Sequence, residues 1–115
     1  MGEAPLAQRK CVPCEGLTEP LPASAAQQLL KDVKGWELVE GKLIRKTVKC
    51  KKFLEAVAFI QKISVIAEAE DHHPDLHLTG YRHLAIELST HAVGGLSEND
   101  FILAAKIDEL LASKS

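Results

Sequence analysis

Long apolar runs and an excess of one charge are both missing from this sequence. No stretch approaches the ~20 apolar residues that a membrane-spanning helix needs, and the first ten residues contain no apolar signal-peptide core. The formal net charge of −2 provides no attraction to nucleic acid or to an anionic membrane. Residues 42–52 are locally basic, and we interpret them as a solvated strand and helix start. We therefore expect a cytoplasmic protein, with the nucleus as a further compartment, that binds neither nucleic acid directly nor membranes.

Cysteine is also scarce. The chain has three cysteines, an odd number that argues against a disulfide framework. Cys11 and Cys14 form a C-x-x-C pair, but a structural zinc site needs two further ligands at matching spacing, and Cys50 is the one thiol left. The pair is therefore two plain thiols in a flexible tail, a redox couple or half of a metal clip. We expect Cys50 to pack in the core.

Proline is rare outside the N-terminal segment. Four of the five prolines fall within residues 1–22, which show little periodicity and which we predict to be a flexible lead. The remaining residues 23–115 have the size and the apolar content of one globular domain.

Hydrophobic periodicity predicts the elements in the first half of that domain. A short amphipathic helix begins with Ser24 as its N-cap and stops at Gly35. Residues rich in β-branched side chains on both sides of a turn at 40–42 predict a two-stranded hairpin. The main helix then covers residues 51–69, which contain no glycine or proline.

The main helix is apolar on more than one face. The predicted core stripe comprises Phe53, Val57, Ile60, Ser64 and Ala67. A second apolar group, formed by Phe59, Ile63 and Ile66, makes the apolar surface wider than one buried face needs. We therefore expect this helix to lie at the centre of the domain or to contact another subunit or a protein partner.

Residues 81–90 alternate strictly between two faces. Leu84, Ile86 and Leu88 share one face, which is typical of a half-buried strand.

The last helix is predicted from Glu98 to Ala112, with Ser97 as N-cap and Asp100 in the place of a capping-box acid. The order of elements is then α-β-β-α-β-β-α. We predict an α+β fold in which a four-stranded antiparallel sheet carries three helices on one face. The edges of so small a sheet favour pairing across a two-fold axis, so we expect a homodimer or a homotetramer.

All five histidines lie in the 24 residues from Glu68 to His91. They are His72, His73, His77, His83 and His91. Histidine exchanges protons near neutral pH and binds metals, so the cluster predicts a proton-transfer or metal site. Pro74 holds the residue before it extended, which turns His72 and His73 to opposite sides of the chain.

Two kinds of site remain open on these residues. A divalent metal would suit His73, Asp75 and His77, which share one side, together with His91. A cofactor-free acid–base site would place two or three imidazoles and a carboxylate around a neutral organic substrate. His77 and His83 are more typical of surface or packing residues, and neither a nucleophile motif nor a phosphate loop accompanies the cluster.

The spacing of the histidines and acids resembles a family signature. It runs Glu68, three residues, His72-His73-Pro74, six residues, Tyr81, nine residues, His91, eight residues, Asp100. This pattern is similar to that of the pterin-4a-carbinolamine dehydratases, also known as dimerisation cofactors of a homeodomain transcription factor. The resemblance covers about residues 20–112. Leu76 and His77 stand where the family commonly has bulky aromatic residues.

The resemblance implies a dehydration. The substrate would be 4a-hydroxytetrahydropterin, released by an aromatic amino acid hydroxylase, and the product quinonoid dihydropterin, as in tetrahydrobiopterin recycling. No metal or redox cofactor is implied. Some members of the family are better known for binding partners than for catalysis, so a homo-oligomeric binding module that uses residues 51–69 is the alternative.

The resemblance also implies residue roles. His72 and His91 would be the acid–base pair at the 4a-hydroxyl and the ring N–H, and His73 would hold or protonate the pterin. Glu68 would be the carboxylate that orients them. The other expected substrate-binding or orienting residues are Pro74, Tyr81 and Asp100.

Overall fold

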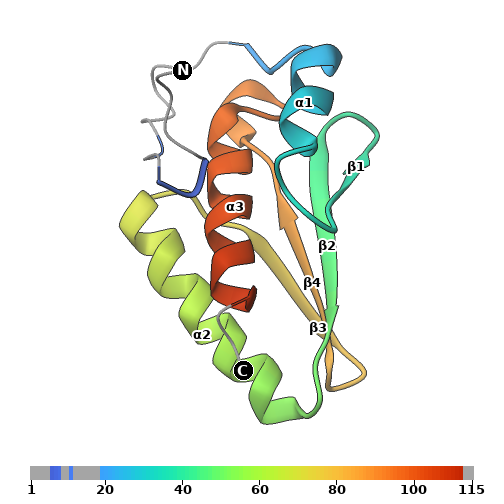
Figure 1. Ribbon diagram of the computed structural model, residues 1–115, viewed down its shortest axis with the longest axis vertical. Helices are drawn as coiled ribbons and strands as arrows, with labels where there is room; N and C mark the ends of the chain where they lie inside the picture. The colour runs from blue at the N-terminus through green and yellow to red at the C-terminus, as the bar shows by residue number, and fades with distance from the viewer. Residues whose placement is uncertain (1–5, 9–10, 12–18, 113–115) are drawn as a thin grey trace.

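A computed structural model describes residues 6–8, 11 and 19–112 of the chain. The elements are α1 (Ala23–Leu30), β1 (Glu37–Val39), β2 (Leu43–Lys49), α2 (Phe53–Glu70), β3 (Asp75–Thr79), β4 (His83–Leu88) and α3 (Glu98–Ala112), with short 3-10 turns at η1 (Leu6–Gln8) and η3 (His91–Val93). The helices lie on one face of the sheet (Figure 1). The predicted α+β class and the order α-β-β-α-β-β-α are confirmed.

The four strands form one antiparallel sheet in the order β1-β2-β4-β3. The predicted hairpin around residues 40–42 is present, because β1 pairs with β2, and β3 pairs with β4 in a second hairpin. Asp75 at the start of β3 lies opposite Glu87 near the end of β4. The segment that precedes β3 and the segment that follows β4 therefore meet at the same end of the sheet.

The buried face of β4 is the predicted one. Leu84, Ile86 and Leu88 are fully buried and share one apolar cluster with Phe101 and Leu103 of α3. α3 is buried along most of its length because it packs against α2 as well as against this cluster.

The buried stripe of α2 differs from the predicted core stripe. The buried residues of α2 are Ala56, Phe59, Ile63 and Ala67, whereas Phe53 and Ser64 are exposed. Ala67 was predicted correctly, but the rest of the stripe was wrong in register. Because α2 is apolar on several sides, periodicity alone does not select the side that meets α3. Phe59, predicted to widen the apolar surface, is instead a core residue.

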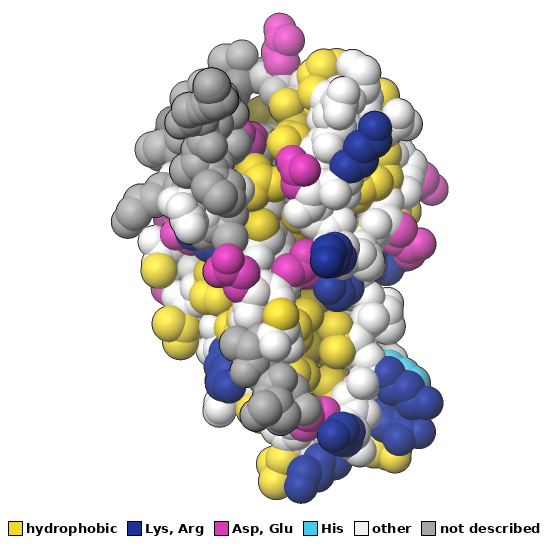
Figure 2. All heavy atoms as spheres, viewed as in Figure 1, with side chains coloured by type: hydrophobic (Ala, Val, Ile, Leu, Met, Phe, Trp, Pro, Cys, Tyr) yellow, Lys and Arg dark blue, Asp and Glu magenta, His cyan; other side chains and the backbone are white. Residues whose placement is uncertain are grey.

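Apolar surface nevertheless remains on the outer side of α2. Leu54 is 71% exposed and Val65 is 69% exposed. Figure 2 shows apolar side chains on this face of the molecule, with lysine and arginine side chains gathered at its lower end, where α2 begins. No helix in the described part of the chain has the length and apolar character needed to cross a membrane.

α1 begins two residues earlier than Ser24 would require as an N-cap. Its N-cap is Pro22, in an extended conformation, and Ser24 lies inside the helix. The predicted N-cap was wrong because the chain before α1 is held elsewhere: the N–H of Leu21 donates to the carbonyl of Leu96 at 2.8 Å.

Trp36 connects the β1–β2 hairpin to α3. Its indole Nε1 donates to Asp108 Oδ1 at 2.9 Å, and Lys46 Nζ donates to the same oxygen at 2.8 Å. These bonds hold the hairpin against α3. The candidate site depends on the position of that helix.

Part of the predicted N-terminal lead contacts the helices. Leu6 is buried in the core cluster. The backbone N–H of Cys11 donates to Glu70 Oε1 at 2.8 Å, and its thiol donates to the carbonyl of Asn99 at 3.7 Å. Cys14 lies outside the described part of the chain, as do the other residues of the lead in the ranges 1–5, 9–10 and 12–18.

Candidate active site

The end of α2 determines where the two adjacent histidines point. α2 closes after Glu70 because Asp71 takes a left-handed conformation with φ 54°, which aspartate tolerates better than most residues. The N–H of His72 then donates to the carbonyl of Ala67 at 3.1 Å, a pattern typical of helix C-termini. The chain reverses at this point and directs His72 back toward the domain.

His72 and His73 lie in opposite environments, as we predicted from the position of Pro74. His72 is 5% exposed, whereas the side chain of His73 is 56% exposed. Each imidazole nevertheless contacts a carboxylate through Nε2. His72 lies 2.6 Å from Asp100 Oδ1 and His73 lies 2.7 Å from Glu68 Oε2.

Asp100 is shared between the site and the start of α3. Its Oδ2 accepts a hydrogen bond from the backbone N–H of Ser97 and another from the hydroxyl of Thr90, each at 2.9 Å. The bond from Ser97 is one half of a capping box, in which the third residue of the helix satisfies the N-cap N–H. The carboxylate thus caps α3 with one oxygen and contacts His72 with the other.

The second nitrogen of His72 is not completely buried. Nε2 contacts Asp100, and within the described residues no completely buried side-chain nitrogen or oxygen lacks a partner. Nδ1 therefore keeps some contact with the surface, and it is the atom of this ring that can meet a bound molecule.

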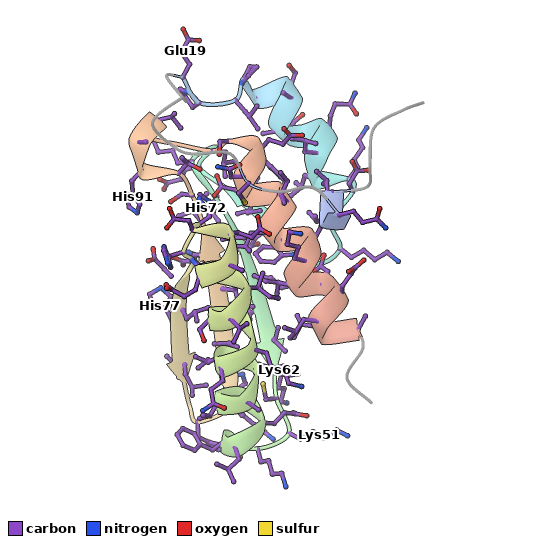
Figure 3. The ribbon with its side chains drawn as sticks, turned by 90° about the vertical axis from the view of Figure 1, so that its left-hand side faces the viewer. Glu19, Lys51, Lys62, His72, His77 and His91 are labelled. Atoms are coloured by element: carbon purple, nitrogen blue, oxygen red, sulfur yellow. The ribbon has the colours of Figure 1, made fainter. Side chains whose placement is uncertain are left out.

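His91 belongs to the same end of the molecule. It begins η3, directly after Thr90, which bonds to the Asp100 that contacts His72. Figure 3 shows His72 and His91 toward one end of the molecule and His77 farther along the sheet. His91 is exposed, so its ring is accessible to a ligand at this end.

Glu68, which we expected to orient the site histidines, contacts one of them, His73. This contact lies on the exposed outer side of the helix end, and Asp100 contacts His72. Pro74 is half-buried and lies between these pairs and β3.

The remaining candidates lie away from this cluster. Tyr81 is exposed in the turn between β3 and β4, at the opposite end of the hairpin from His72 and His91, and its ring lies 5.5 Å from the guanidinium of Arg82. His83 is exposed near the same turn.

His77 Nε2 lies 3.4 Å from Glu87 Oε1 on the sheet. The residues of the metal alternative are therefore divided, because His73 contacts Glu68 and His77 contacts Glu87. In residues 6–8, 11 and 19–112, no group of three or more histidine, cysteine or acidic side chains is close enough together to hold a metal ion.

Thr90 and Ser97 are the site residues whose contacts the sequence analysis missed. Their hydroxyls lie 2.7 Å apart, and both side chains are buried. The strand alternation contained a signal for Thr90, because it continues the inward positions of Ile86 and Leu88. A polar residue on an otherwise apolar buried face requires a polar partner, and the partner here is Asp100.

The arrangement suits proton exchange with a neutral organic molecule. His72 and His91 can act at the molecule from two elements, while the carboxylates restrict the orientation of the neighbouring rings.

The comparisons with known proteins point to one family. The family described as pterin 4 alpha carbinolamine dehydratase matches residues 19–110. A protein of Nitrosomonas eutropha, provisionally named a pterin-4-alpha-carbinolamine dehydratase, is 47% identical over 94% of this chain and 95% of its own length. Pterin-4-alpha-carbinolamine dehydratase 2 of Arabidopsis thaliana, a mitochondrial protein, is 46% identical over 93% of this chain, which spans 59% of that relative.

Solved structures agree with that match. A transcriptional coactivator/pterin dehydratase from Brucella melitensis has a TM-score of 0.74 and 30% identity, over 80% of this chain and 98% of the other. A pterin dehydratase-like protein identified as a RuBisCO assembly factor in the alpha-carboxysome has a TM-score of 0.56 and 22% identity, over 70% and 93% of the two chains. The second likeness concerns the fold alone.

Proposed function

The chain belongs to the pterin 4 alpha carbinolamine dehydratase family, and on that premise we propose that it is a hydro-lyase that dehydrates 4a-hydroxytetrahydropterin to quinonoid dihydropterin. In this reaction the bond between C4a and the hydroxyl oxygen breaks and a ring nitrogen loses its proton. The electron pair of that N–H bond forms the new double bond, and the hydroxyl leaves as water. No electrons are gained or lost overall.

The reaction requires an acid and a base at one small site. Hydroxide is a poor leaving group, so a general acid must protonate it, and a general base must accept the ring proton. Such proton transfers contribute typically ~10²–10⁴-fold each. Imidazole suits both tasks because its unperturbed pKa lies near neutrality.

We assign the acid–base pair to His72 and His91. His72 would act through Nδ1, the nitrogen that does not contact Asp100, and His91 would act from η3. His73 would hold the pterin, with Glu68 orienting its ring, and Asp100 orients His72. Pro74 would line the site, whereas the position of Tyr81 at the far turn gives no support for a role within the same subunit.

The observation that carries this proposal is the buried Asp100–His72 pair. A histidine held by a buried carboxylate on one nitrogen has its ring orientation fixed, which leaves the other nitrogen for proton transfer.

The direct test generates the carbinolamine with an aromatic amino acid hydroxylase and follows its ultraviolet decay. The protein should accelerate this decay, and a matched variant at an exposed histidine far from the site, His83→Ala, should do so equally well. An unchanged decay rate in the presence of the wild-type protein would reject the dehydratase proposal.

We also propose that the product enters tetrahydrobiopterin recycling in the cytoplasm. A hydroxylase reaction supplied with limiting pterin and a dihydropterin reductase should run longer when this protein is added. Equal product yields with and without the protein would argue against this role.

A second candidate function is a homodimeric or homotetrameric binding module. The observation that favours it is the exposure of Leu54 and Val65 on α2, since large exposed apolar side chains on one helix mark contact surfaces. The double variant Leu54→Glu, Val65→Glu should reduce the molar mass measured by light scattering. If the mass is unchanged while the variant stays folded, α2 is not the subunit contact.

A further inference from the structure

The buried hydroxyls of Thr90 and Ser97 form a unit with Asp100. Thr90 is 1% exposed and Ser97 is 4% exposed, and their oxygens lie 2.7 Å apart. The Thr90 hydroxyl lies 2.9 Å from Asp100 Oδ2. Neither hydroxyl can reach a substrate directly from this position, so any role in the reaction must pass through Asp100.

The proton directions in this unit follow from the chemistry of its members. An ionised carboxylate only accepts hydrogen bonds, so Thr90 must donate its one hydroxyl proton to Asp100. The oxygen of Thr90 must then accept the bond that joins it to Ser97. Ser97 therefore donates twice, through its hydroxyl to Thr90 and through its backbone N–H to Asp100.

Both donors on Asp100 converge on Oδ2 and leave Oδ1 to His72. Two donors, together with the N-terminal end of the 15-residue helix α3, stabilise negative charge on this carboxylate. A charged Oδ1 must accept a proton-bearing nitrogen, which places the proton of neutral His72 on Nε2.

We propose that the Thr90–Ser97 hydroxyl pair is a positioning unit, which keeps the His72 proton on Nε2 through Asp100 and leaves Nδ1 as the atom that exchanges a proton with the substrate. The part about the substrate rests on the proposed dehydration. The part about the tautomer needs no substrate. Without the Thr90 hydroxyl, Asp100 has one donor fewer, so the pair more readily takes up one proton from water. The competing arrangement, with one proton on Asp100 and one on His72 Nδ1, then becomes populated.

The experiment compares Thr90→Val, which removes the hydroxyl at nearly constant shape, with Thr90→Ser, which retains it. Long-range proton–nitrogen NMR of protein with ¹⁵N-labelled histidine rings reports which ring nitrogen carries the proton. The signals of His72 are assigned by their loss in His72→Gln. An exposed threonine far from the site, Thr79→Val, is the matched control.

We expect the Nε2-protonated pattern in the wild type, in Thr90→Ser and in Thr79→Val, and a population protonated on Nδ1 in Thr90→Val. Turnover in the carbinolamine assay should fall ~10–100-fold in kcat for Thr90→Val with KM nearly unchanged, and Thr90→Ser should restore most of it. A purely structural role would lower the melting temperature without moving the tautomer.

An unchanged His72 pattern in folded Thr90→Val would overturn the proposal, as would a Thr90→Ser variant that behaves like Thr90→Val. If Thr90→Val does not fold, Ser97→Ala serves instead, because it removes the donor to Thr90 and retains the backbone bond. It should move the tautomer in the same direction by a smaller amount, and an unmoved tautomer would reject the proposal. A wild-type protein that fails to accelerate carbinolamine decay would reject the proposed function, while the NMR result would still decide the positioning role.

Discussion

His72 and His73 are adjacent in the chain and contact carboxylates at nearly equal distances, yet the two pairs differ in burial and in the further partners of the carboxylate. The His72–Asp100 pair is buried, and Asp100 has two further donors. The His73–Glu68 pair is open to water, with side chains 56% and 78% exposed. Exposed pairs contribute typically 0–1 kcal/mol because water and salt screen them, whereas a buried group that loses its partner is strongly destabilising.

Distance alone therefore does not show which of the two pairs contributes more to stability. The buried pair ties the end of α2 to the start of α3, so it supports the fold and the site together. The exposed pair joins two residues at the end of one helix and supports the orientation of one ring.

The largest difference should appear in stability. Asp100→Ala leaves the donors of His72, Thr90 and Ser97 without their acceptor, so we expect the free energy of unfolding in urea to fall by about 3–5 kcal/mol. Glu68→Ala should change it by no more than about 0.5 kcal/mol. Equal losses in the two variants would mean that burial does not distinguish the pairs.

The next largest effect tests whether a histidine must be buried to be important for turnover. His91 is exposed, so His91→Ala should leave the unfolding free energy within about 0.5 kcal/mol of wild type. Its turnover in the carbinolamine assay should nevertheless fall by at least ~10²-fold if His91 is an acid–base group. Near-wild-type turnover would show that it is not.

A smaller effect is expected at the exposed pair. Glu68→Gln should lower turnover by no more than about 5-fold, the equivalent of about 1 kcal/mol. Added salt should reduce the difference between variant and wild type, because it screens the same interaction. A loss as large as that of His91→Ala, insensitive to salt, would place Glu68 in the reaction itself.

The smallest effect concerns Cys11, which lies next to the buried His72–Asp100 pair. Cys11 donates to the carbonyl of Asn99, beside Asp100. Burial, and then the charge of Glu70, raise the pKa of its thiol from 9.0 to about 12. Because the folded pKa lies above the unfolded one, this contribution to stability is fully present below pH 9 and is lost as the pH rises through about 12.

Melting temperatures of wild type and Cys11→Ala should therefore differ most below pH 9 and converge above it. The control is Cys50→Ala, whose core position should lower the melting temperature without this convergence. A constant difference between wild type and Cys11→Ala at all pH values would show that the thiol does not titrate in this way.

Much of the fold followed from local pattern. The alternation of Leu84, Ile86 and Leu88 identified the buried face of β4, and the Ser97 and Asp100 signals located the start of α3. The stripe of α2 was misassigned because a helix that is apolar on several sides offers several candidate faces, and the position of α3 selects one.

The sequence predicted which residues belong to the candidate site better than it predicted which of them contact one another. His72, His73 and His91 stood out because the sequence places five histidines within 24 residues. The separation of His72 from His73 followed from the proline between them and β3. The partner of His72 did not follow, because Asp100 is 28 positions away along the chain and competes in the sequence with the nearer Glu68.

The sequence by itself determined the order of elements, the inward face of β4 and the residues that can exchange protons, because these depend on neighbours a few positions away. Only the tertiary structure decided which carboxylate holds which histidine, that Thr90 and Ser97 join Asp100, and that Tyr81 lies at the far turn. Those contacts depend on how β4 and α3 pack against the end of α2, and packing over such separations leaves no periodic signal in the chain.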